Sequence, residues 1–303
     1  MKLGFVFHSG VGNAVLSTPM LKALRSMYPK AEIIVFTWER CAEVFRNLSC
    51  VDKVALKLDQ VNDVDYLLMS PNGVMCLLEK SKKIKRVIQI KRPNWEKHES
   101  EYYMDLIREF GYNGSTPSPE ITPEGQAPQE KYAVMSLGFI EGIEWHLKQI
   151  NDNDEWVAVC NYLIDEGHRI FFLGVQKDYE IAQDIILQLP QGKTVNACGL
   201  TSLKQATAII NSANMFVGLD CGLAHIASCF QIPSTCVWTF TDLIKNKPLN
   251  PNLEIVEIEC VKKHNCQYGG WKSCENKFCR NITSDMIING IKKVEKKFFN
   301  GTV

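Results

Sequence analysis

The sequence lacks an excess of charge of either sign, because 34 Lys and Arg residues balance 34 Asp and Glu residues in a chain of 303 residues. A chain without net charge has no overall attraction for a polyanion, which argues against a nucleic-acid partner. A long apolar run is also missing. The first run, which ends at His8 and Gly10, is too short for a signal peptide's apolar core or for a membrane span. We therefore expect a cytoplasmic protein.

Closely paired cysteines are absent as well, although the chain has 12 cysteines. The paired two-residue spacing of a zinc ribbon does not occur. Without a secretion signal, free thiols or metal ligands are more typical than a disulfide framework. Four cysteines lie close together near the end of the chain, at Cys260, Cys266, Cys274 and Cys279. Their spacing leaves a structural metal site, free thiols and disulfides as alternatives.

Short apolar runs alternate with amphipathic stretches in both halves of the chain. We expect strands at 2–9, 31–37, 65–71, 85–90, 131–138, 168–175, 214–220 and 234–240. We expect helices at 14–29, 39–49, 152–167, 178–189, 202–213 and 284–299. Segment 111–131 is rich in proline and glycine and is predicted to be a linker. Strands that alternate with helices form parallel sheets, so the sequence predicts an α/β fold of two doubly wound domains, 1–125 and 126–303.

Residues that follow the strands are the candidates for ligand contacts, because open α/β sheets bind ligands beyond the carboxyl ends of their strands. After the first strand, Gly10 and Gly12 would allow a tight turn and a close approach to a ligand at a helix N-terminus. A dinucleotide fingerprint would need a third glycine where Val15 stands and an acidic residue near Thr37 and Trp38. The pattern disfavours an NAD-dependent oxidoreductase.

The segment FVGLDCGLAHIASCF, residues 216–230, runs from a buried strand into a helix and carries Asp220 and His225 at the junction. Asp220 could cap the helix by accepting hydrogen bonds from its first amides. Alternatively the junction is a ligand site, because the unpaired amides and partial positive charge of a helix N-terminus favour a phosphate. The residues of this segment alone leave both interpretations open.

Two further helix starts carry candidate residues. Lys148 stands just ahead of a helix whose predicted cap is Asn151 or Asp152, and it is either a phosphate contact or a solvated lysine. Thr201 or Ser202 is predicted to cap the helix at 202–213.

The order of three segments resembles glycosyltransferase family 9, whose best-known members are ADP-heptose:lipopolysaccharide heptosyltransferases. The segments are GVGNAVLSTPMLKALRSMYPKAEI, CGLTSLKQATAIINSANMFVGLDCGLAHIAS and CENKFCRNITSDMI. The most specific part is the Asp-x-Gly-x-x-His pattern at Asp220, Gly222 and His225. The resemblance implies the GT-B architecture, with two Rossmann-like domains facing across a cleft. It also implies that a sugar is transferred from a nucleotide-sugar donor with inversion and without a catalytic metal.

The resemblance implies a donor site and a class of substrates. In the family, the matching aspartate contacts the donor sugar, the adjoining amides hold the diphosphate, and the matching lysine reaches a phosphate. The implied donor-binding residues are Lys148, Thr201, Ser202, Asp220, Cys221, Gly222, Leu223 and His225. The donor would be an ADP-sugar, with heptose as the default, and the acceptor a glycan or glycolipid such as lipopolysaccharide core. No cofactor is implied for catalysis, and the cysteine segment would hold a structural zinc or iron.

Two positions depart from the family pattern. The residue matching Asn13 is commonly an aspartate base, and an amide cannot take a proton, so Asn13 could only orient the acceptor. His8, with an unperturbed pKa near neutrality, is the candidate base. A structural histidine, a transfer that needs little base assistance, and a catalytically silent nucleotide-sugar-binding protein are the alternatives. Cys221 stands where serine or threonine is usual, which weakens a side-chain contact but leaves the backbone amide unchanged.

A basic stretch at 79–98 carries eight Lys or Arg residues against two Glu residues. It is either a solvated face or a surface that attracts a phosphorylated acceptor or an anionic membrane, which would give peripheral contact with the inner face of the membrane. Trp95, Tyr102 and Tyr103, which lie in or after it, could stack on sugar rings or pack in the core.

Overall fold

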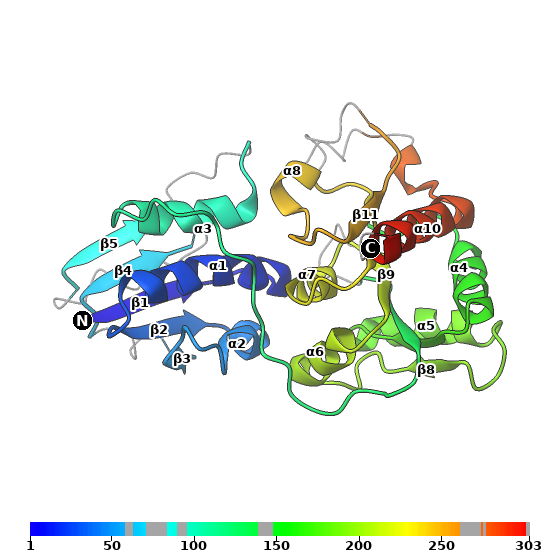
Figure 1. Ribbon diagram of the computed structural model, residues 1–303, viewed down its shortest axis with the longest axis horizontal. Helices are drawn as coiled ribbons and strands as arrows, with labels where there is room; N and C mark the ends of the chain where they lie inside the picture. Colours follow the sequence, from blue (N-terminus) through cyan, green and yellow to red (C-terminus); the bar gives the residue numbers. More distant parts are fainter. Residues whose placement is uncertain are drawn as a thin grey trace. The chain divides into compact units, whose positions relative to one another are not determined.

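A computed structural model of the chain describes residues 1–57, 63–70, 84–89, 96–138, 148–260, 274 and 277–300. The chain divides into two compact units, Met1–Thr122 and Pro123–Val303, each built on a parallel sheet (Figure 1). The structural division falls three residues before the boundary expected at 125/126. The predicted fold class, two parallel α/β domains, is confirmed.

The first unit has a five-stranded parallel sheet in the order β3-β2-β1-β4-β5. Its strands are β1 (Lys2–Phe7), β2 (Glu32–Thr37), β3 (Lys53–Ala55), β4 (Tyr66–Met69) and β5 (Arg86–Gln89), and its helices are α1 (Val11–Met27), α2 (Glu39–Phe45) and α3 (Glu99–Arg108). Helix α1 packs beside both α2 and α3. Phe5 and Phe7 of β1 contact the ring of Tyr103 from α3. Tyr103 is therefore a core residue, as one of the two interpretations held.

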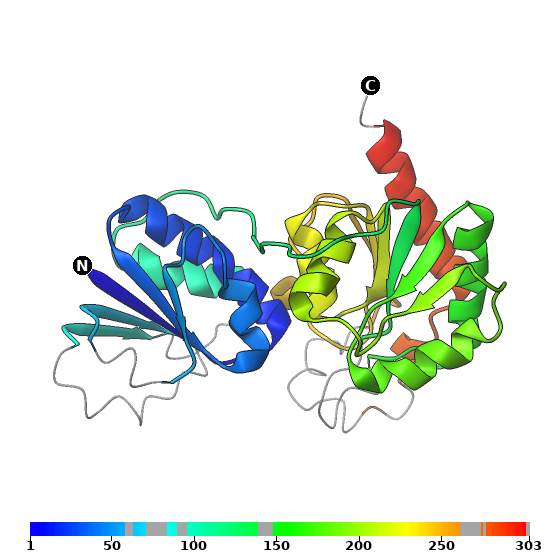
Figure 2. The ribbon, with the colours of Figure 1, turned by 90° about the horizontal axis from the view of Figure 1, so that it is seen from below.

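The second unit has a six-stranded parallel sheet in the order β11-β10-β9-β6-β7-β8. Its strands are β6 (Tyr132–Ser136), β7 (Arg169–Phe172), β8 (Thr194–Asn196), β9 (Met215–Leu219), β10 (Ser234–Val237) and β11 (Leu253–Val256). Its α-helices are α4 (Asp154–Asp165), α5 (Tyr179–Ile186), α6 (Leu203–Asn211), α7 (Gly222–Cys229), α8 (Leu243–Asn246) and α10 (Ser284–Asn300). Figure 2 shows α6 and α7 on one face of this sheet and α4, α5 and α10 on the other.

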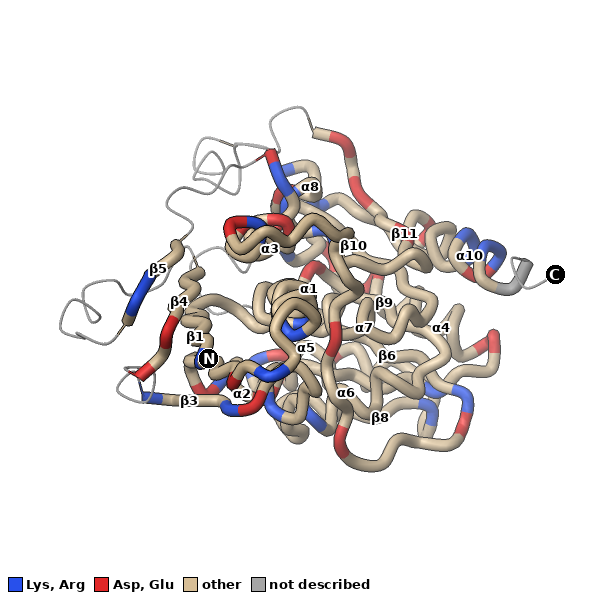
Figure 3. Tube along the Cα trace, turned by 60° about the vertical axis from the view of Figure 1, so that its left-hand side comes forward, with Lys and Arg blue, Asp and Glu red and all other residues tan. Residues whose placement is uncertain are grey.

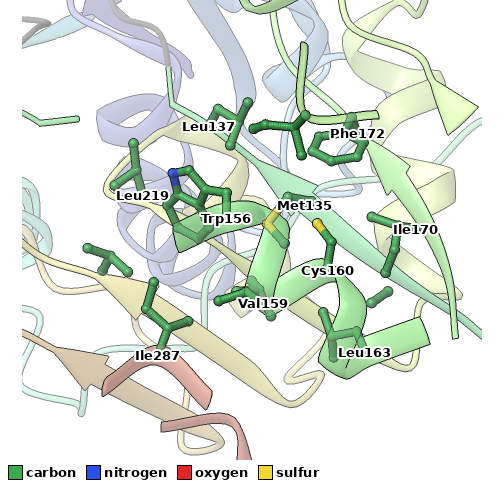
Figure 4. Close-up of a cluster of buried hydrophobic side chains, with 14 of the residues drawn as sticks. Met135, Leu137, Trp156, Val159, Cys160, Leu163, Ile170, Phe172, Leu219 and Ile287 are labelled. Atoms are coloured by element: carbon green, nitrogen blue, oxygen red, sulfur yellow. The ribbon is translucent and has the colours of Figure 1, made fainter. Parts of the chain in front are cut away.

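The core of the second unit forms because α4 is apolar on one face. Trp156, Val159, Cys160 and Leu163 recur at helical spacing and are fully buried. They pack on β6 and β7, and Ile287 of α10 joins the same cluster (Figure 4). This packing fixes the sheet whose strand ends carry the candidate residues.

Strand β9 lies directly against β6 at Gly218. A Cβ atom placed there would lie 2.4 Å from the carbonyl oxygen of Ser136. This oxygen belongs to the backbone of β6, so it cannot move aside as a flexible side chain could. We expect Gly218→Ala to destabilise the protein by roughly 1–3 kcal/mol, measured by denaturant unfolding. Gly4→Ala is the comparison, because its added Cβ would mainly meet the mobile end of Leu67, at 2.8 Å. An equal decrease in the free energy of unfolding for Gly218→Ala and Gly4→Ala would contradict this account.

The helix that follows Lys148 begins later than predicted. The N-cap residue of α4 is Asn153, and Asp152 Oδ1 accepts a hydrogen bond from the backbone N–H of Asp154 at 2.9 Å. Asn151 does not cap the helix, because its N–H donates to the carbonyl of Arg280 at 3.0 Å and its side chain donates to Asn281. The predicted cap at Asn151 is wrong, whereas Asp152 supplies the side-chain acceptor for the first helical amide.

Most of the basic stretch at 79–98, including Trp95, lies outside the described residues. Its three described cations each have an acidic partner: Lys85 pairs with Asp65 at 2.6 Å, Arg86 with Glu109 at 2.9 Å and Lys97 with Asp105 at 2.9 Å. Figure 3 shows basic residues on β5 with acidic segments nearby. The attraction of this stretch for an acceptor or a membrane stays a prediction. Over the described ranges, no helix is both long and apolar enough to cross a membrane.

Candidate functional site

The main candidate site lies where β6 and β9 end. Strand β6 has β9 on one side and β7 on the other, so the two connections leave the sheet in opposite directions, which is where open α/β sheets bind ligands. Lys148 follows β6 and Asp220 follows β9, 72 residues later. Lys148 Nζ lies 2.5 Å from Asp220 Oδ2 and 3.1 Å from the Asp220 carbonyl oxygen. The Lys148 and Asp220 side chains are only 12% and 7% exposed, so this is a largely buried ion pair.

Lys148 is held in place through the next residue. Gln149 is buried, and its Nε2 donates to the carbonyl of Leu137 at the end of β6, at 2.9 Å. Arg280 Nε donates to the Gln149 carbonyl at 2.7 Å. The interpretation of Lys148 as a solvated lysine is therefore wrong. Gln149 and Arg280 carry no motif in the sequence that would have marked them.

Asp220 does not cap α7. The N-cap residue is Cys221, and no side chain makes a capping hydrogen bond there. Asp220 Oδ2 instead accepts from Lys148 Nζ and from Thr241 Oγ1, each at 2.5 Å. Among the described residues, no hydrogen bond reaches Oδ1. The carboxylate is thus fixed through one oxygen, and the other is available to a ligand.

The Asp220 carboxyl is ionised despite its burial. Burial alone would raise the pKa of Asp220, but Lys148, the Thr241 hydroxyl and the nearby His225 favour the charged form, and the pKa is lowered overall. His225 lies in α7 and is buried, at 4% exposure. The site therefore pairs a fixed negative charge with a fixed positive charge.

Thr241 was not found from the sequence. It follows β10, and its carbonyl accepts from Nε1 of the fully buried Trp238 at 2.8 Å. The next residue, Asp242, is the N-cap of α8 and accepts from the backbone N–H of Ile244 at 2.9 Å. The segment TFTD after an apolar strand was the available signal, because helix caps follow strand ends in α/β units.

The N-terminus of α7 has the features of an anion site. Its first turn has no acidic residue, and the early amides of Gly222 and Leu223 have no acceptor one turn before them in the helix. The Cys221 sulfur lies 3.4 Å from Ser136 Oγ. Burial raises the pKa of the Cys221 thiol, so this side chain adds no negative charge beside the amides.

The start of α6 is capped as predicted. Ser202 is the N-cap residue: its Oγ accepts from Gln205 N at 3.2 Å, and Gln205 Oε1 accepts from Ser202 N at 2.8 Å. Thr201 lies one residue before the cap and is half-buried. The Ser202 hydroxyl is therefore engaged with its own helix, and ligand contacts of Ser202 and Thr201 stay predictions.

In the first unit, the acceptor-side candidates lie at the start of α1. Gly10 is the N-cap residue with φ −78° and ψ 167°, and Gly12 is the second residue of the helix. This extended conformation does not require glycine, so the turn between β1 and α1 does not depend on the residue type at Gly10. A Cβ at Gly10 would meet no atom within 4 Å, so the space beside it is open. Asn13 Nδ2 donates to Ser9 Oγ at 2.8 Å, which fixes the amide orientation.

His8 directly follows β1 and lies in an aromatic environment. Its side chain is 5% exposed and stacks on Trp38, with ring centroids 4.9 Å apart, while Phe36 contacts it edge-on at 5.1 Å. Neither Nδ1 nor Nε2 of His8 has a hydrogen-bond partner within the described ranges. Burial lowers the pKa of His8, so the imidazole is neutral at pH 7 and has a lone pair that can accept a proton.

The predicted metal site is described only in part. Cys266 lies outside the described residues, whereas Cys260, Cys274 and Cys279 lie within them. Across the described part of the chain, no three His, Cys, Asp or Glu side chains are close enough to hold a metal ion. A structural zinc or iron at these cysteines stays a prediction.

A family model described as glycosyltransferase family 9 (heptosyltransferase) matches residues 80–272, which is more than half of the chain. The chain belongs to this family. The resemblance that was based on the pattern around Asp220 is confirmed, and the matched range includes Lys148 and Asp220.

Two curated relatives agree with this assignment. Lipopolysaccharide heptosyltransferase 2 of Salmonella typhimurium is 23% identical over 156 residues, which cover 47% of this chain and 45% of that protein. The match thus spans less than half the length of the Salmonella protein. Lipooligosaccharide heptosyltransferase 2 of Haemophilus ducreyi is 24% identical over 314 residues, which cover 85% of this chain and 89% of that protein.

Two solved structures share the fold. A glycosyl transferase of family 9 from Veillonella parvula superimposes with a TM-score of 0.81 at 15% identity, covering 97% of this chain and 96% of that one. The ADP-heptose lps heptosyltransferase II of Escherichia coli superimposes with a TM-score of 0.78 at 17% identity, covering 97% and 98%. The predicted GT-B fold class is confirmed by these neighbours.

Proposed function

We propose that this family 9 chain is an inverting, metal-independent glycosyltransferase that moves a sugar from a nucleotide-sugar donor to a glycan or glycolipid acceptor. The names of its relatives and structural neighbours support ADP-heptose as the donor and a lipopolysaccharide or lipooligosaccharide as the acceptor. The observation that carries the proposal is the buried Lys148–Asp220 pair beside the α7 N-terminus.

The donor site suits the charges that develop during transfer. When the bond between the anomeric carbon and the diphosphate breaks, its electron pair stays on the diphosphate and positive charge grows on the sugar. The early amides of α7 and the Lys148 ammonium offset the negative charge. An ammonium has three N–H donors, and two are used on Asp220, so one is left for a phosphate oxygen. A cation and a helix terminus thus serve the diphosphate without a metal.

Asp220 acts on the sugar in this proposal. Its Oδ1 can accept a hydrogen bond from a sugar hydroxyl, and its negative charge offsets the charge at the anomeric carbon. Thr241 and Lys148 hold Oδ2, so the orientation of Oδ1 is set before the donor binds. Preorganised charge of this kind stabilises the transition state more than a mobile carboxylate would.

His8 is the proposed base, and Asn13 orients the acceptor. A ring nitrogen of the neutral His8 takes the proton of the acceptor hydroxyl as its oxygen bonds to the anomeric carbon, opposite the departing diphosphate. The Asn13 carbonyl oxygen, on the amide fixed by Ser9, accepts a hydrogen bond from the acceptor.

Asn13 also favours a second candidate, a catalytically silent protein that binds a nucleotide sugar. Calorimetry with ADP, UDP, GDP, CDP and NAD tests the donor site, and mass analysis of an acceptor incubated with ADP-heptose tests transfer. Selective ADP binding with a glycosylated product supports the enzyme, and ADP binding without product supports the silent protein. Binding of none of these nucleotides would overturn the donor site.

A further inference from the structure

Trp38 is the residue of the first unit whose position the proposed function leaves unexplained. It follows β2, stands at the N-cap position of α2, and is 47% exposed, which is unusual for a large aromatic side chain. Strands β1 and β2 are parallel neighbours with Phe7 opposite Thr37, so His8 and Trp38 are the next residues in register. Their rings stack nearly parallel, with an interplanar angle of 16°.

We propose that Trp38 is a positioning residue for the catalytic base: its indole covers one face of the His8 imidazole and fixes the plane in which that ring presents its nitrogens to the acceptor hydroxyl. This inference rests on the proposed function, in which His8 takes the acceptor proton. It names a residue that belongs to neither the family pattern nor the donor site.

Aromatic packing orients His8 in place of the usual hydrogen bond. A catalytic histidine is ordinarily held by a carboxylate or carbonyl that accepts from one ring nitrogen. In the described ranges, neither His8 nitrogen has such a partner. The contacts that remain are the Trp38 face, the Phe36 edge and the backbone, where His8 N–H donates to Ser70 Oγ at 3.4 Å. The stack therefore restricts rotation of the ring, and both nitrogens are buried beneath the aromatic contacts without a hydrogen-bond partner among the described residues.

Arg40 ties the indole to the segment that carries the base. Its guanidinium carbon lies 4.6 Å from the Trp38 ring centroid, a cation–π distance. The same guanidinium donates to the carbonyl of Ser9, directly after His8, at 3.5 Å. Burial lowers the pKa of His8 and keeps the ring neutral, which is the form that a base needs.

The other titratable groups around His8 are accounted for element by element. On α2, Glu39 pairs with Arg46, and the Cys41 thiol donates to the Ser9 carbonyl at 3.3 Å. Burial raises the pKa of Cys41, so the thiol is uncharged at neutral pH. The flanking side chains Asn13 of α1 and Ser70 after β4 do not titrate. None of these groups shifts the pKa of His8, which is lowered by burial.

The test compares Trp38→Ala with Trp38→Phe. Proton NMR of the His8 ring measures its pKa directly, and kcat/KM against pH measures the base in action. In Trp38→Ala, water reaches the imidazole, so the pKa of His8 should rise toward its ordinary value near 6.5. The midpoint pH of the acid limb, where kcat/KM falls at low pH, should move upward by the same amount. We expect kcat to fall on the order of tenfold. Trp38→Phe, which keeps an aromatic face, should show a His8 pKa and a kcat close to those of the unmodified chain.

A change at an exposed apolar residue elsewhere is the control. Leu187 is 74% exposed at the end of α5, and Leu187→Ala should move neither measurement. An unchanged His8 pKa in Trp38→Ala would overturn the role of Trp38. A shifted His8 pKa with an unshifted acid limb would instead overturn the assignment of His8 as the base, and with it the catalytic purpose of the stack.

Discussion

Asp220→Asn is expected to lower kcat on the order of 10²- to 10³-fold while the protein stays folded. The amide keeps the shape of the side chain, but it cannot offset positive charge at the anomeric carbon. Its partner Lys148 would also lose the negative charge that holds it 2.5 Å away. The measurement is turnover of ADP-heptose, with circular dichroism as the check on folding.

The matched change is Lys148→Met, which acts mainly on binding. Without the ammonium, the diphosphate keeps the α7 amides but loses a charged donor, so the Kd for ADP should rise about 10- to 100-fold in calorimetry. Asp220→Asn should change the ADP affinity much less, because Asp220 is assigned to the sugar. Equal effects of both substitutions on ADP binding would contradict this division of roles.

The double variant Lys148→Met/Asp220→Asn separates stability from activity. Removing one partner of a buried pair leaves an unpaired charge and costs about 3–5 kcal/mol, whereas removing both charges costs less. The double variant should therefore be more stable than either single variant, yet inactive. An active double variant would show that the pair only stabilises the fold.

The same comparison predicts a pH dependence. The pKa of Asp220 is lower in the folded protein than in the unfolded chain, so the pair stabilises the fold above the unfolded value of about 4. This stabilisation is lost as the pH falls through the folded pKa. Urea unfolding from pH 7 to pH 3 should show a steeper loss for the unmodified chain than for the double variant.

The strand-to-helix junctions could be predicted from the sequence because their signals are local. The apolar runs before His8 and Asp220 each end where a helix pattern starts, and a parallel sheet places such ends on one edge. The family pattern at Asp220 added the proposed role of this junction in donor binding. These local signals predict the structure only of residues that are neighbours along the chain.

Contacts between distant segments could not be predicted. Lys148 and Asp220 are 72 residues apart, and Thr241 reaches Asp220 from a third strand end. Asp220 has the residue type of a helix cap, and only the competing ammonium of Lys148 shows why it does not act as one. Tertiary contacts thus decide between the helix-cap and ligand-site interpretations of Asp220, which the local sequence does not distinguish.

Some elements were missed because they are short or weakly patterned. Strands β3, β8 and β11 have only three or four residues, and the three residues of β8 are all half-buried, so no apolar run marks them. Helix α3 was missed because charged residues fill its first turn, although its later residues are buried against α1. These elements lie at the sheet edges or on one face of a sheet. Missing them therefore did not change the predicted location of the candidate site.

His8→Gln is the second change with a large expected effect. Removing the base should lower kcat on the order of 10²- to 10⁴-fold and leave ADP affinity unchanged, because His8 belongs to the first unit and the donor residues to the second. His168→Gln is the matched control. His168 is also buried, at 4% exposure, and its pKa is also lowered by burial, but it lies just before β7, away from the strand ends that carry the site.

Adding Asn13→Asp to His8→Gln asks whether the missing carboxylate can replace the histidine. In the unmodified chain, activity should rise with pH through a limb below 6.5, because burial lowers the pKa of His8 and the neutral form is the base. In the double variant, part of the activity should return, with its limb near the aspartate range of about 4. Unchanged turnover in His8→Gln would show that transfer needs no base from His8. Loss of activity in Asn13→Asp alone would show that the amide held by Ser9 has its own role, since the new carboxylate cannot donate a hydrogen bond.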